Sequence, residues 1–297
     1  MVFFVPKKGA RLGNWLFQYA VAASAGDGRV STLDVPYARD AKNRYSDFLN
    51  GLELIHSFPK DARVVKESLS HTVQIAQEGS SDSIVLDGYF QRAEYLNRDK
   101  VLSLFSIPKD KLTRYMEIYG EWLDRKDITA IHVRRGDYLR LSHCHPFVGK
   151  QYFRDCIAAM PEVQHFLVFS DDIEWCKAFF PKAFPDKVFC FVEGTDMLDD
   201  LHIQSICRNN IISNSSFSWW GAYLNRNPNK RILAPSNWFG FYLRMLKVDA
   251  SGMYYDGVQV VPNAYTPWRF AKGVLDMMRE VPKNLIAKVY HTVLKRH

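Results

Sequence analysis

The stretch Ile128-Thr-Ala-Ile-His-Val133 continues directly into Arg134-Arg-Gly-Asp-Tyr138. Its first part is a short run of β-branched and apolar residues, which predicts a buried β-strand. Its second part places two guanidinium groups, a glycine and a carboxylate at the end of that strand. Ligands of open parallel sheets bind at the carboxyl ends of the strands, so this stretch marks where chemistry is expected if the surrounding sheet is parallel.

The segments that follow indicate that the sheet is parallel. Short apolar runs alternate with segments of helical period, which is typical of a sheet with helices on both faces. We predict strands at 165–169, 187–191, 210–213 and 231–233, and helices at 151–160, 173–180, 197–207 and 216–224.

The N-terminal half shows the same alternation. A strand at 2–5, a helix at 12–25 and a strand at 30–33 give βαβ order, and a further apolar run covers 84–90. A helix at 109–123 leads into the polar turn 124–127, where we place a domain boundary. The predicted organisation is an N-terminal acceptor-side domain over 1–125, a donor-binding domain over 126–262 and a C-terminal helical segment over 263–297 that packs back on the N-terminal domain.

Composition favours one globular enzyme. The chain has 297 residues, of which 47% are hydrophobic and 24% charged, so disordered and collagen-like classes have no support. No apolar run approaches the roughly 18 residues of a membrane span, and the start is too short for a signal peptide, which predicts a cytoplasmic protein. Five cysteines without a C-x-x-C pair predict buried free thiols rather than disulfides or a zinc knuckle.

A net charge of +7 and a pI near 9.0 suit an anionic partner, such as a nucleotide diphosphate, an acidic membrane surface or nucleic acid. The lysines are dispersed rather than gathered in a stripe with interleaved aromatic residues, which argues against nucleic acid. The segment 284–297 has the pattern of a basic amphipathic helix. We expect it to pack against the N-terminal domain, and peripheral contact with an anionic membrane is the alternative.

The arginine motif predicts an anion site, because the guanidinium fork matches phosphate oxygens and keeps its charge. Strand alternation sends Arg134 to the same face as His132 and sends Arg135 to the other face, so Arg134 is the expected phosphate ligand. For Arg135, a structural ion pair is an equal alternative. Asp137 is either its partner in that pair or a general base.

A second motif runs from Asn209 to Gly221, where an apolar strand is followed by hydroxyl groups that open a helix. Ser215 and Ser216 lie where the free N–H groups of the helix point outward, which predicts a second anion site. Ordinary N-capping explains one serine but not the cluster of four. Trp219 and Trp220 are expected in the core. A third, weaker signal is the glycine- and asparagine-containing turn at 9–19.

Taken together, four strings resemble the bacterial α-1,2-fucosyltransferases, glycosyltransferase family 11, over about residues 2–238. They are Gly13-Asn14 with Phe17-Gln18-Tyr19, His132-Val-Arg-Arg-Gly-Asp-Tyr138, Phe169-Ser-Asp-Asp172 and Ile211-Ile-Ser-Asn-Ser-Ser-Phe-Ser-Trp-Trp220. The resemblance implies a GT-B-type arrangement, with two Rossmann-like domains facing a cleft. It also implies GDP-fucose as the donor, held mainly by the second domain, and inversion at the anomeric carbon.

The resemblance also implies roles for single residues. Trp15 and the pair Ala10-Arg11 depart from the family pattern, which leaves the acceptor contacts on that side open. The implied ligands are Arg134 for the β-phosphate, Ser215, Ser216 and Phe217 for the diphosphate and sugar, His132 near the nucleotide, and Asn14 facing the cleft from the first domain.

The residues themselves bear on metal use and on the base. The chain has no D-x-D pair of the kind that chelates a metal between phosphates, and two arginines with a helix N-terminus can neutralise the same charge. We therefore predict activity without metal and without any cofactor beyond the donor. Asp137 is the first choice for the general base because it follows the phosphate-binding strand, and Glu193 and Asp171 are rivals.

The expected reaction is transfer of L-fucose to the 2-hydroxyl of a galactose-terminated oligosaccharide or lipid-linked glycan. The alternatives are a fucosyltransferase of another linkage, or a non-catalytic protein that binds a nucleotide sugar or nucleic acid. The expected location is the cytoplasm, with a peripheral position on the inner face of the plasma membrane as a further expectation.

Overall fold

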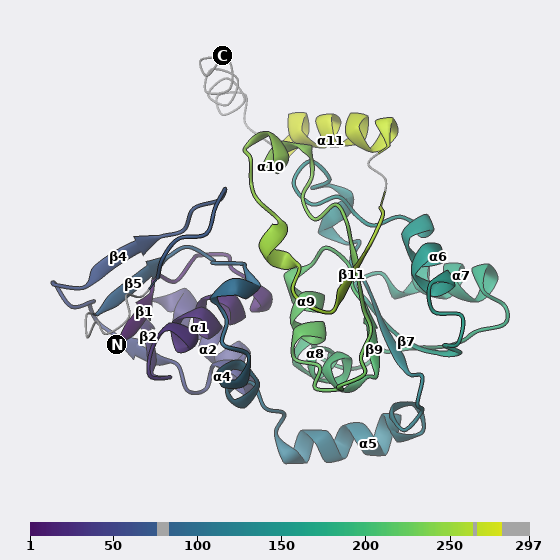
Figure 1. The fold of residues 1–297 in the computed structure, drawn as a ribbon, viewed down its shortest axis with the longest axis horizontal. Coiled ribbons are helices and arrows are strands. Elements are labelled where there is room, and N and C mark those ends of the chain that lie inside the picture. Colours follow the sequence, from purple (N-terminus) through teal and green to yellow (C-terminus); the bar gives the residue numbers. More distant parts are fainter. Residues whose placement is uncertain (76–82, 264–265, 281–297) are drawn as a thin grey trace.

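The computed structural model of the chain describes residues 1–75, 83–263 and 266–280. Two parallel β-sheets organise these residues, one in each half of the chain (Figure 1). The α/β class and the pair of Rossmann-like sheets that the sequence predicts are confirmed. Within the described ranges, no helix combines the length and the apolar character that crossing a membrane requires.

The N-terminal sheet has five strands in the order β3-β2-β1-β5-β4. Its central strand, β1, is buried over its whole length and pairs with a parallel neighbour on each side. The strands are β1 (Val2–Phe4), β2 (Val30–Leu33), β3 (Glu53–Ile55), β4 (Arg63–Lys66) and β5 (Ile84–Asp87). The helices are α1 (Leu12–Ala25), α2 (Pro36–Arg44), α3 (Ser46–Leu49) and α4 (Arg98–Leu104), and α5 (Lys109–Leu123) leads to the second half.

The second sheet has six strands in the order β11-β10-β9-β6-β7-β8. β6 lies inside it, with all five residues buried, because the run that opens the arginine motif is apolar. The strands are β6 (Thr129–Val133), β7 (His165–Ser170), β8 (Val188–Phe191), β9 (Asn209–Ile211), β10 (Ile232–Pro235) and β11 (Val258–Val261). The helices are α6 (Lys150–Ala158), α7 (Ile173–Ala183), α8 (Met197–Ile206), α9 (Ser216–Tyr223), α10 (Phe241–Met245) and α11 (Pro267–Glu280).

One apolar core crosses from the first half to the second. Phe17 of α1 lies 4.6 Å from the ring of Trp219 and 4.9 Å from that of Trp220, measured between ring centroids. The indole Nε1 of Trp220 donates a hydrogen bond of 3.0 Å to the carbonyl of Gly13. Both tryptophans are 0% exposed, so their expected place in the core is confirmed. The five cysteines are free thiols, as predicted, but only Cys156, Cys176 and Cys207 are buried, whereas Cys144 and Cys190 are partly exposed.

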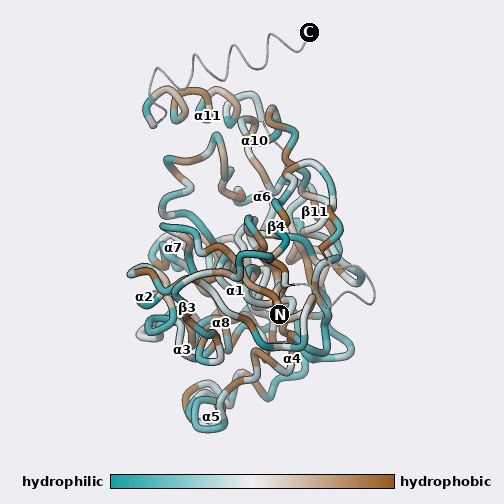
Figure 2. The backbone as a smooth tube through the Cα atoms, turned by 90° about the vertical axis from the view of Figure 1, so that its left-hand side faces the viewer, coloured by the Kyte–Doolittle hydropathy of each residue, from teal (hydrophilic) through white to brown (hydrophobic). Residues whose placement is uncertain are grey.

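The C-terminal helix α11 contacts the second half of the chain rather than the N-terminal domain against which the sequence places segment 263–297. Phe270 packs on Phe241 of α10 at 5.1 Å, and Asp276 accepts a hydrogen bond from Ser142 at 2.6 Å. The inward face of α11 is polar, and its side chains form hydrogen bonds with the loop after β6. These hydrogen bonds explain why α11 packs on the second half rather than on the first. α10 and α11 lie at one end of the molecule and α5 at the other (Figures 1 and 2). The helix expected at 284–297 lies outside the described residues.

Candidate active site

The arginine motif forms a tight turn directly after β6. Nη2 of Arg134 lies 2.5 Å from Oδ1 of Asp137, and its Nη1 lies 3.0 Å from Oδ2 of Asp171 at the end of β7. The guanidinium also lies 5.5 Å from the ring centroid of Tyr138. The fork of Arg134 is therefore held between two carboxylates, with a side chain that is 22% exposed.

Gly136 allows this turn to approach β7 closely. A Cβ atom at this position would lie 2.4 Å from Oδ2 of Asp171, closer than such contacts occur. Oδ1 of Asp171 accepts a hydrogen bond of 2.8 Å from the backbone N–H of Arg135. One carboxylate thus fixes both the backbone of the turn and the side chain of Arg134.

Arg135 points away from this arrangement. Its Nε donates to Oδ2 of Asp172 at 2.8 Å, and its guanidinium lies 4.3 Å from the centroid of Trp175 in α7. Of the two interpretations that the sequence leaves open, the structure shows the ion pair, and the partner is Asp172 rather than Asp137.

His132 connects the arginine motif to the serine motif. Its Nδ1 lies 2.8 Å from Oγ of Ser213 at the end of β9, and its ring lies 5.3 Å from that of Phe217. Burial, aided by the nearby charge of Arg134, lowers the pKa of His132 from 6.5 to about 3. The imidazole is therefore neutral near pH 7 and acts as a hydrogen-bonding group rather than a cation.

The serine motif forms the N-terminus of α9. Its first helical hydrogen bond runs from Trp219 N to Ser215 O at 3.0 Å, so the N–H groups of the preceding turn have no acceptor within the helix. Ser215 occupies the N-cap position, and the cap has no side-chain hydrogen bond. The helix terminus therefore presents N–H donors and a partial positive charge on the side of the sheet where Arg134 lies.

The first half of the chain reaches this site through the first turn of α1. Oδ1 of Asn14 accepts from Nε2 of Gln91 at 2.6 Å and from Oγ of Ser216 at 3.4 Å. A Cβ at Gly13 would lie 2.5 Å from Oγ of Ser216. Asn14 therefore meets α9 directly, while Gln91, which follows β5, is a site residue that sequence reasoning missed.

Arg11 is a second contributor that the sequence argument missed, although it lies beside the Gly13-Asn14 pair. Its Nη2 lies 2.7 Å from Oδ2 of Asp137, across the two halves. Burial alone would raise the pKa of Asp137, but the hydrogen bond from Arg11 and the charge of Arg134 together lower it below 3.8. Asp137 is therefore ionised and is held by two guanidinium groups.

The rival bases lie in different surroundings. Both oxygens of Asp171 are engaged by the arginine turn. Glu193 follows β8, has a side chain that is 52% exposed and pairs with Lys177 at 2.8 Å. Among the residues that the structure describes, no three His, Cys, Asp or Glu side chains lie together as metal ligands would.

Two Rossmann-like α/β halves, with an arginine turn and a helix N-terminus at the strand ends of the second, give the two-domain arrangement that the motif resemblance implies. Residues 65–242 match the sequence model of Glycosyl transferase family 11. The chain belongs to this family, so the resemblance seen in its motifs is confirmed.

Curated relatives carry related names. The O-antigen biosynthesis glycosyltransferase WbnK of Escherichia coli is 35% identical over 165 residues, covering 52% of this chain and 55% of that protein, so the match spans about half of that relative. An alpha-1,2-colitosyltransferase of Escherichia coli is 29% identical over 283 residues, covering 80% of this chain and 93% of that protein. The galactoside alpha-(1,2)-fucosyltransferase 1 of Leontopithecus chrysomelas is 31% identical over 107 residues, covering 33% and 29%.

Solved structures give more distant matches. The alpha-1,6-fucosyltransferase NodZ, co-crystallised with GDP, has a TM-score of 0.46 and 17% identity, covering 74% of this chain and 91% of that one. POFUT1 has a TM-score of 0.44 and 12% identity, covering 78% and 97%. These values are too low to assign a role to any residue.

Proposed function

We propose that this glycosyltransferase transfers L-fucose from GDP-fucose to the 2-hydroxyl of a galactose-terminated glycan, with inversion at the anomeric carbon. The supporting observation is the arrangement of two anion-binding groups, Arg134 after β6 and the N-terminus of α9. The hydrogen-bonded pair of neutral side chains His132 and Ser213 connects the two motifs that carry them. The names of two family relatives, a colitosyltransferase and a fucosyltransferase that both form α-1,2 linkages, favour this donor class and this linkage.

The chemistry follows from where charge develops. As the bond between C1 of fucose and the β-phosphate oxygen breaks, its electron pair passes to that oxygen, and GDP leaves with added negative charge. Arg134 would stabilise this charge from β6, and the N–H groups near Ser215, Ser216 and Phe217 would do so from α9. Asn14 would face the acceptor from the first half of the chain. These roles need no metal and no cofactor besides the donor.

The acceptor hydroxyl must lose a proton as it attacks. We propose Asp137 as the base that takes this proton. In its ion pairs with Arg11 and Arg134, Asp137 is a weak base. It would gain proton affinity when the diphosphate draws those guanidinium groups away, so that binding of the donor prepares the base.

A second donor is favoured by one comparison, because the alpha-1,2-colitosyltransferase matches over 93% of its own length. Colitose differs from fucose only by lacking the 3-hydroxyl. The same phosphate site would serve GDP-colitose, and the contacts to the sugar ring would decide between the two donors.

The proposed acceptor is a galactose-terminated oligosaccharide or a lipid-linked glycan, and we propose no role for nucleic acid. We place the enzyme in the cytoplasm, peripherally on the inner face of the plasma membrane. A lipid-linked acceptor at that surface would be consistent with the basic charge of the chain.

One experiment tests the proposal. The purified chain is incubated with GDP-fucose, GDP-colitose, GDP-mannose or UDP-galactose and galactose-terminated oligosaccharides, with and without EDTA, and the product linkage and anomeric configuration are determined by NMR. We expect an α-1,2-linked product that is unaffected by EDTA. Another linkage would correct the acceptor position, activity restored only by magnesium or manganese would refute metal independence, and absence of transfer from every donor would favour a binding protein.

A further inference from the structure

The helix α11 has an inverted amphipathic pattern. Its exposed face carries large apolar side chains at a spacing that places them in one stripe along the helix. The exposed fractions are 65% for Trp268, 55% for Leu275 and 65% for Met278. Single exposed apolar residues are ordinary, but a contiguous stripe of this size marks an interaction surface.

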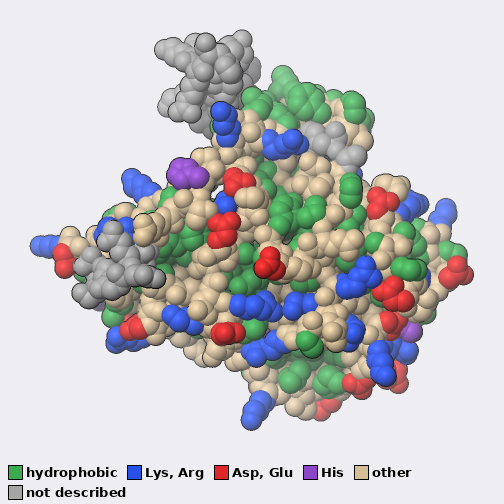
Figure 3. Space-filling view, in the orientation of Figure 1, with side chains coloured by type: hydrophobic (Ala, Val, Ile, Leu, Met, Phe, Trp, Pro, Cys, Tyr) green, Lys and Arg blue, Asp and Glu red, His purple; other side chains and the backbone are tan. Residues whose placement is uncertain are grey.

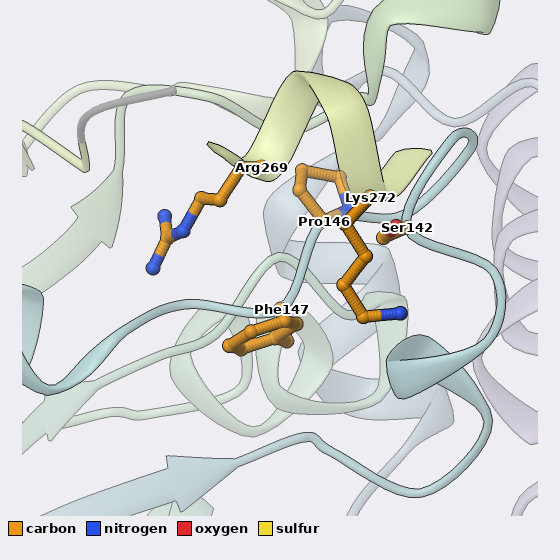
Figure 4. Close-up of a pocket in the computed structure, with 5 residues that line it drawn as sticks. All are labelled: Ser142, Pro146, Phe147, Arg269 and Lys272. Atoms are coloured by element: carbon orange, nitrogen blue, oxygen red, sulfur yellow. The ribbon is translucent and has the colours of Figure 1, made fainter. Parts of the chain in front are cut away.

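The opposite face of α11 is polar although it packs against the protein. Nζ of Lys272 lies 2.7 Å from Oδ2 of Asp276 and also donates to the carbonyl of Leu139. Asp276 is only 4% exposed and accepts from Ser142. Figure 4 shows Arg269 and Lys272 projecting from α11 toward the loop after β6. These polar contacts fix which face of α11 points outward.

The end of α10 adds further exposed apolar side chains at the same end of the molecule. Met245 is 50% exposed and Leu246 is 40% exposed, and the exposed cations Arg244 and Lys247 flank them in the sequence. The packing of Phe270 on Phe241 joins α10 to α11. Figure 3 shows hydrophobic side chains gathered at this end of the molecule. We call Met245, Leu246, Trp268, Leu275 and Met278 the apolar cap.

The composition of the apolar cap and its rim indicates its occupant. Tryptophan, leucine and methionine inside a rim of cations suit the boundary of an anionic bilayer, where apolar side chains enter the acyl region and cations meet the headgroups. The rim includes Arg244 and Lys247, and Arg279 lies exposed in the last turn of α11. The sequence after α11 has the same combination of cationic and apolar residues, with Lys283 and Lys288 among apolar residues.

We propose that the apolar cap docks the enzyme on an anionic membrane surface. The inference deepens the proposed location at the membrane and assigns it to named side chains. Because α11 also holds the loop that follows the arginine motif, the docked face is joined to the donor site through Lys272 and Asp276. A lipid-linked acceptor held in the same membrane would then lie close to the donor site.

The test measures flotation of the full chain with vesicles, in the absence of donor and acceptor. Vesicles of phosphatidylcholine with phosphatidylglycerol are compared with vesicles of phosphatidylcholine alone. We expect wild type to bind the anionic vesicles and the double variant Trp268→Ser, Met278→Gln to bind about tenfold or more weakly. A second variant, Met245→Gln with Leu246→Gln, should also bind more weakly. Binding should fall as salt is raised.

The matched control is Ile118→Gln on α5, which removes an apolar side chain of 55% exposure at the opposite end of the molecule. This control should bind vesicles as wild type does. All variants should keep wild-type turnover with a soluble acceptor, which verifies folding and reports on the proposed reaction separately from docking. The proposal is overturned if wild type does not bind anionic vesicles, or if the variants bind equally well. It is also overturned if light scattering shows that the substitutions disrupt a dimer while vesicle binding persists.

Discussion

At the scale of single residues, the proposed donor site is defined by how charges are paired. Arg134 forms ion pairs with both Asp137 and Asp171. Asp137 also forms an ion pair with Arg11 from the other half of the chain. Such pairing keeps the guanidinium groups in place without a ligand. A diphosphate can then replace carboxylate oxygens as their partner, because the same fork geometry suits both anions.

Replacing Arg134 by lysine should separate geometry from charge. Lysine keeps the positive charge but cannot span two carboxylates or bind a phosphate with a fork, so we expect kcat/KM for donor transfer to fall by about 10²- to 10³-fold. Steady-state kinetics with the donor measures this loss. Arg140→Lys, at an exposed position just beyond the turn, is the control and should behave as wild type. An active Arg134→Lys variant would remove Arg134 from the phosphate site.

Asp137→Asn tests the proposed base. We expect turnover to fall by about 10²-fold or more while GDP binding, measured by calorimetry, changes far less. Equal losses of turnover and GDP affinity would instead assign Asp137 to the positioning of Arg134. The parallel substitutions Asp171→Asn and Glu193→Gln address the rivals, and a larger selective loss of turnover in either one would move the base there.

The buried His132 should make stability depend on pH. Its folded pKa of about 3 lies below the reference value of 6.5, so only the unfolded chain takes up the proton as the pH falls below 6.5. Its contribution to stability is therefore complete above pH 6.5 and is lost progressively toward pH 3. Between pH 7 and 5, the free energy of unfolding of His132→Asn should fall by about 2 kcal/mol less than that of wild type. Urea unfolding at both pH values measures this, and parallel losses in the two proteins would contradict it.

At the scale of elements, the contact of α1 with α9 joins the two sheets at the site itself. Gly13 makes this contact possible because a Cβ there would lie 2.8 Å from the backbone carbon of Ser216 and 2.9 Å from the backbone nitrogen of Phe217. Backbone atoms of a packed helix cannot give way as the end of a flexible side chain can. The position of α9 relative to Asn14 therefore depends on the absence of a side chain at Gly13.

Gly13→Ala should consequently move α9 or α1 and cost about 1–3 kcal/mol of stability. Thermal unfolding and donor turnover should both register the change. Gly120→Ala on α5 is a matched control, because its added Cβ would meet only Cε of Met116 at 3.9 Å. In that helix the substitution should be neutral or stabilising by up to about 1 kcal/mol. A Gly13→Ala protein as stable and active as wild type would show that the contact is loose.

Sequence patterns identify some of these elements and miss others for physical reasons. β6 was predictable because its run is rich in β-branched and apolar residues, as buried parallel strands are. The strand before α9 begins with two asparagines, and its signal is the apolar pair Ile211-Ile212. β4 and β11 lie at sheet edges and are largely exposed, so their patterns are weak. The roles of Arg11 and Gln91 arise from contacts across the two halves, which no local pattern encodes. The residues named from the motifs do adjoin in space, and Arg135 could be assigned only after Asp172 and Trp175 were seen beside it.

At the scale of the whole molecule, the two sheets share an apolar core that runs through α1 and α9. Residues of the first half, such as Phe17 and Leu16, belong to the same buried cluster as Trp219, Trp220 and Ile232 of the second. A polar cluster beside this core adds to the contact, where Lys111 of α5 lies 2.6 Å from Asp47 and 3.1 Å from Asp199. Neither half can separate without exposing part of this core.

The chain should therefore unfold in one cooperative transition. Thermal unfolding followed by calorimetry, far-ultraviolet and near-ultraviolet circular dichroism should give coincident midpoints. Phe17→Ala should lower that single midpoint, because it removes the ring packed on both tryptophans and costs about 3–5 kcal/mol. Two separated transitions, or a shift confined to one of them in Phe17→Ala, would show that the halves are independent.

The placement of tryptophans gives this enzyme its own optical readout. Trp219 and Trp220 are completely shielded between the two halves, whereas Trp268 is 65% exposed on α11. Shielded indoles emit at shorter wavelengths than hydrated ones. Parting of the halves would therefore shift the emission of Trp219 and Trp220 to the red, and lipid binding would shift the emission of Trp268 to the blue. Two separate events can thus be followed in the unlabelled protein.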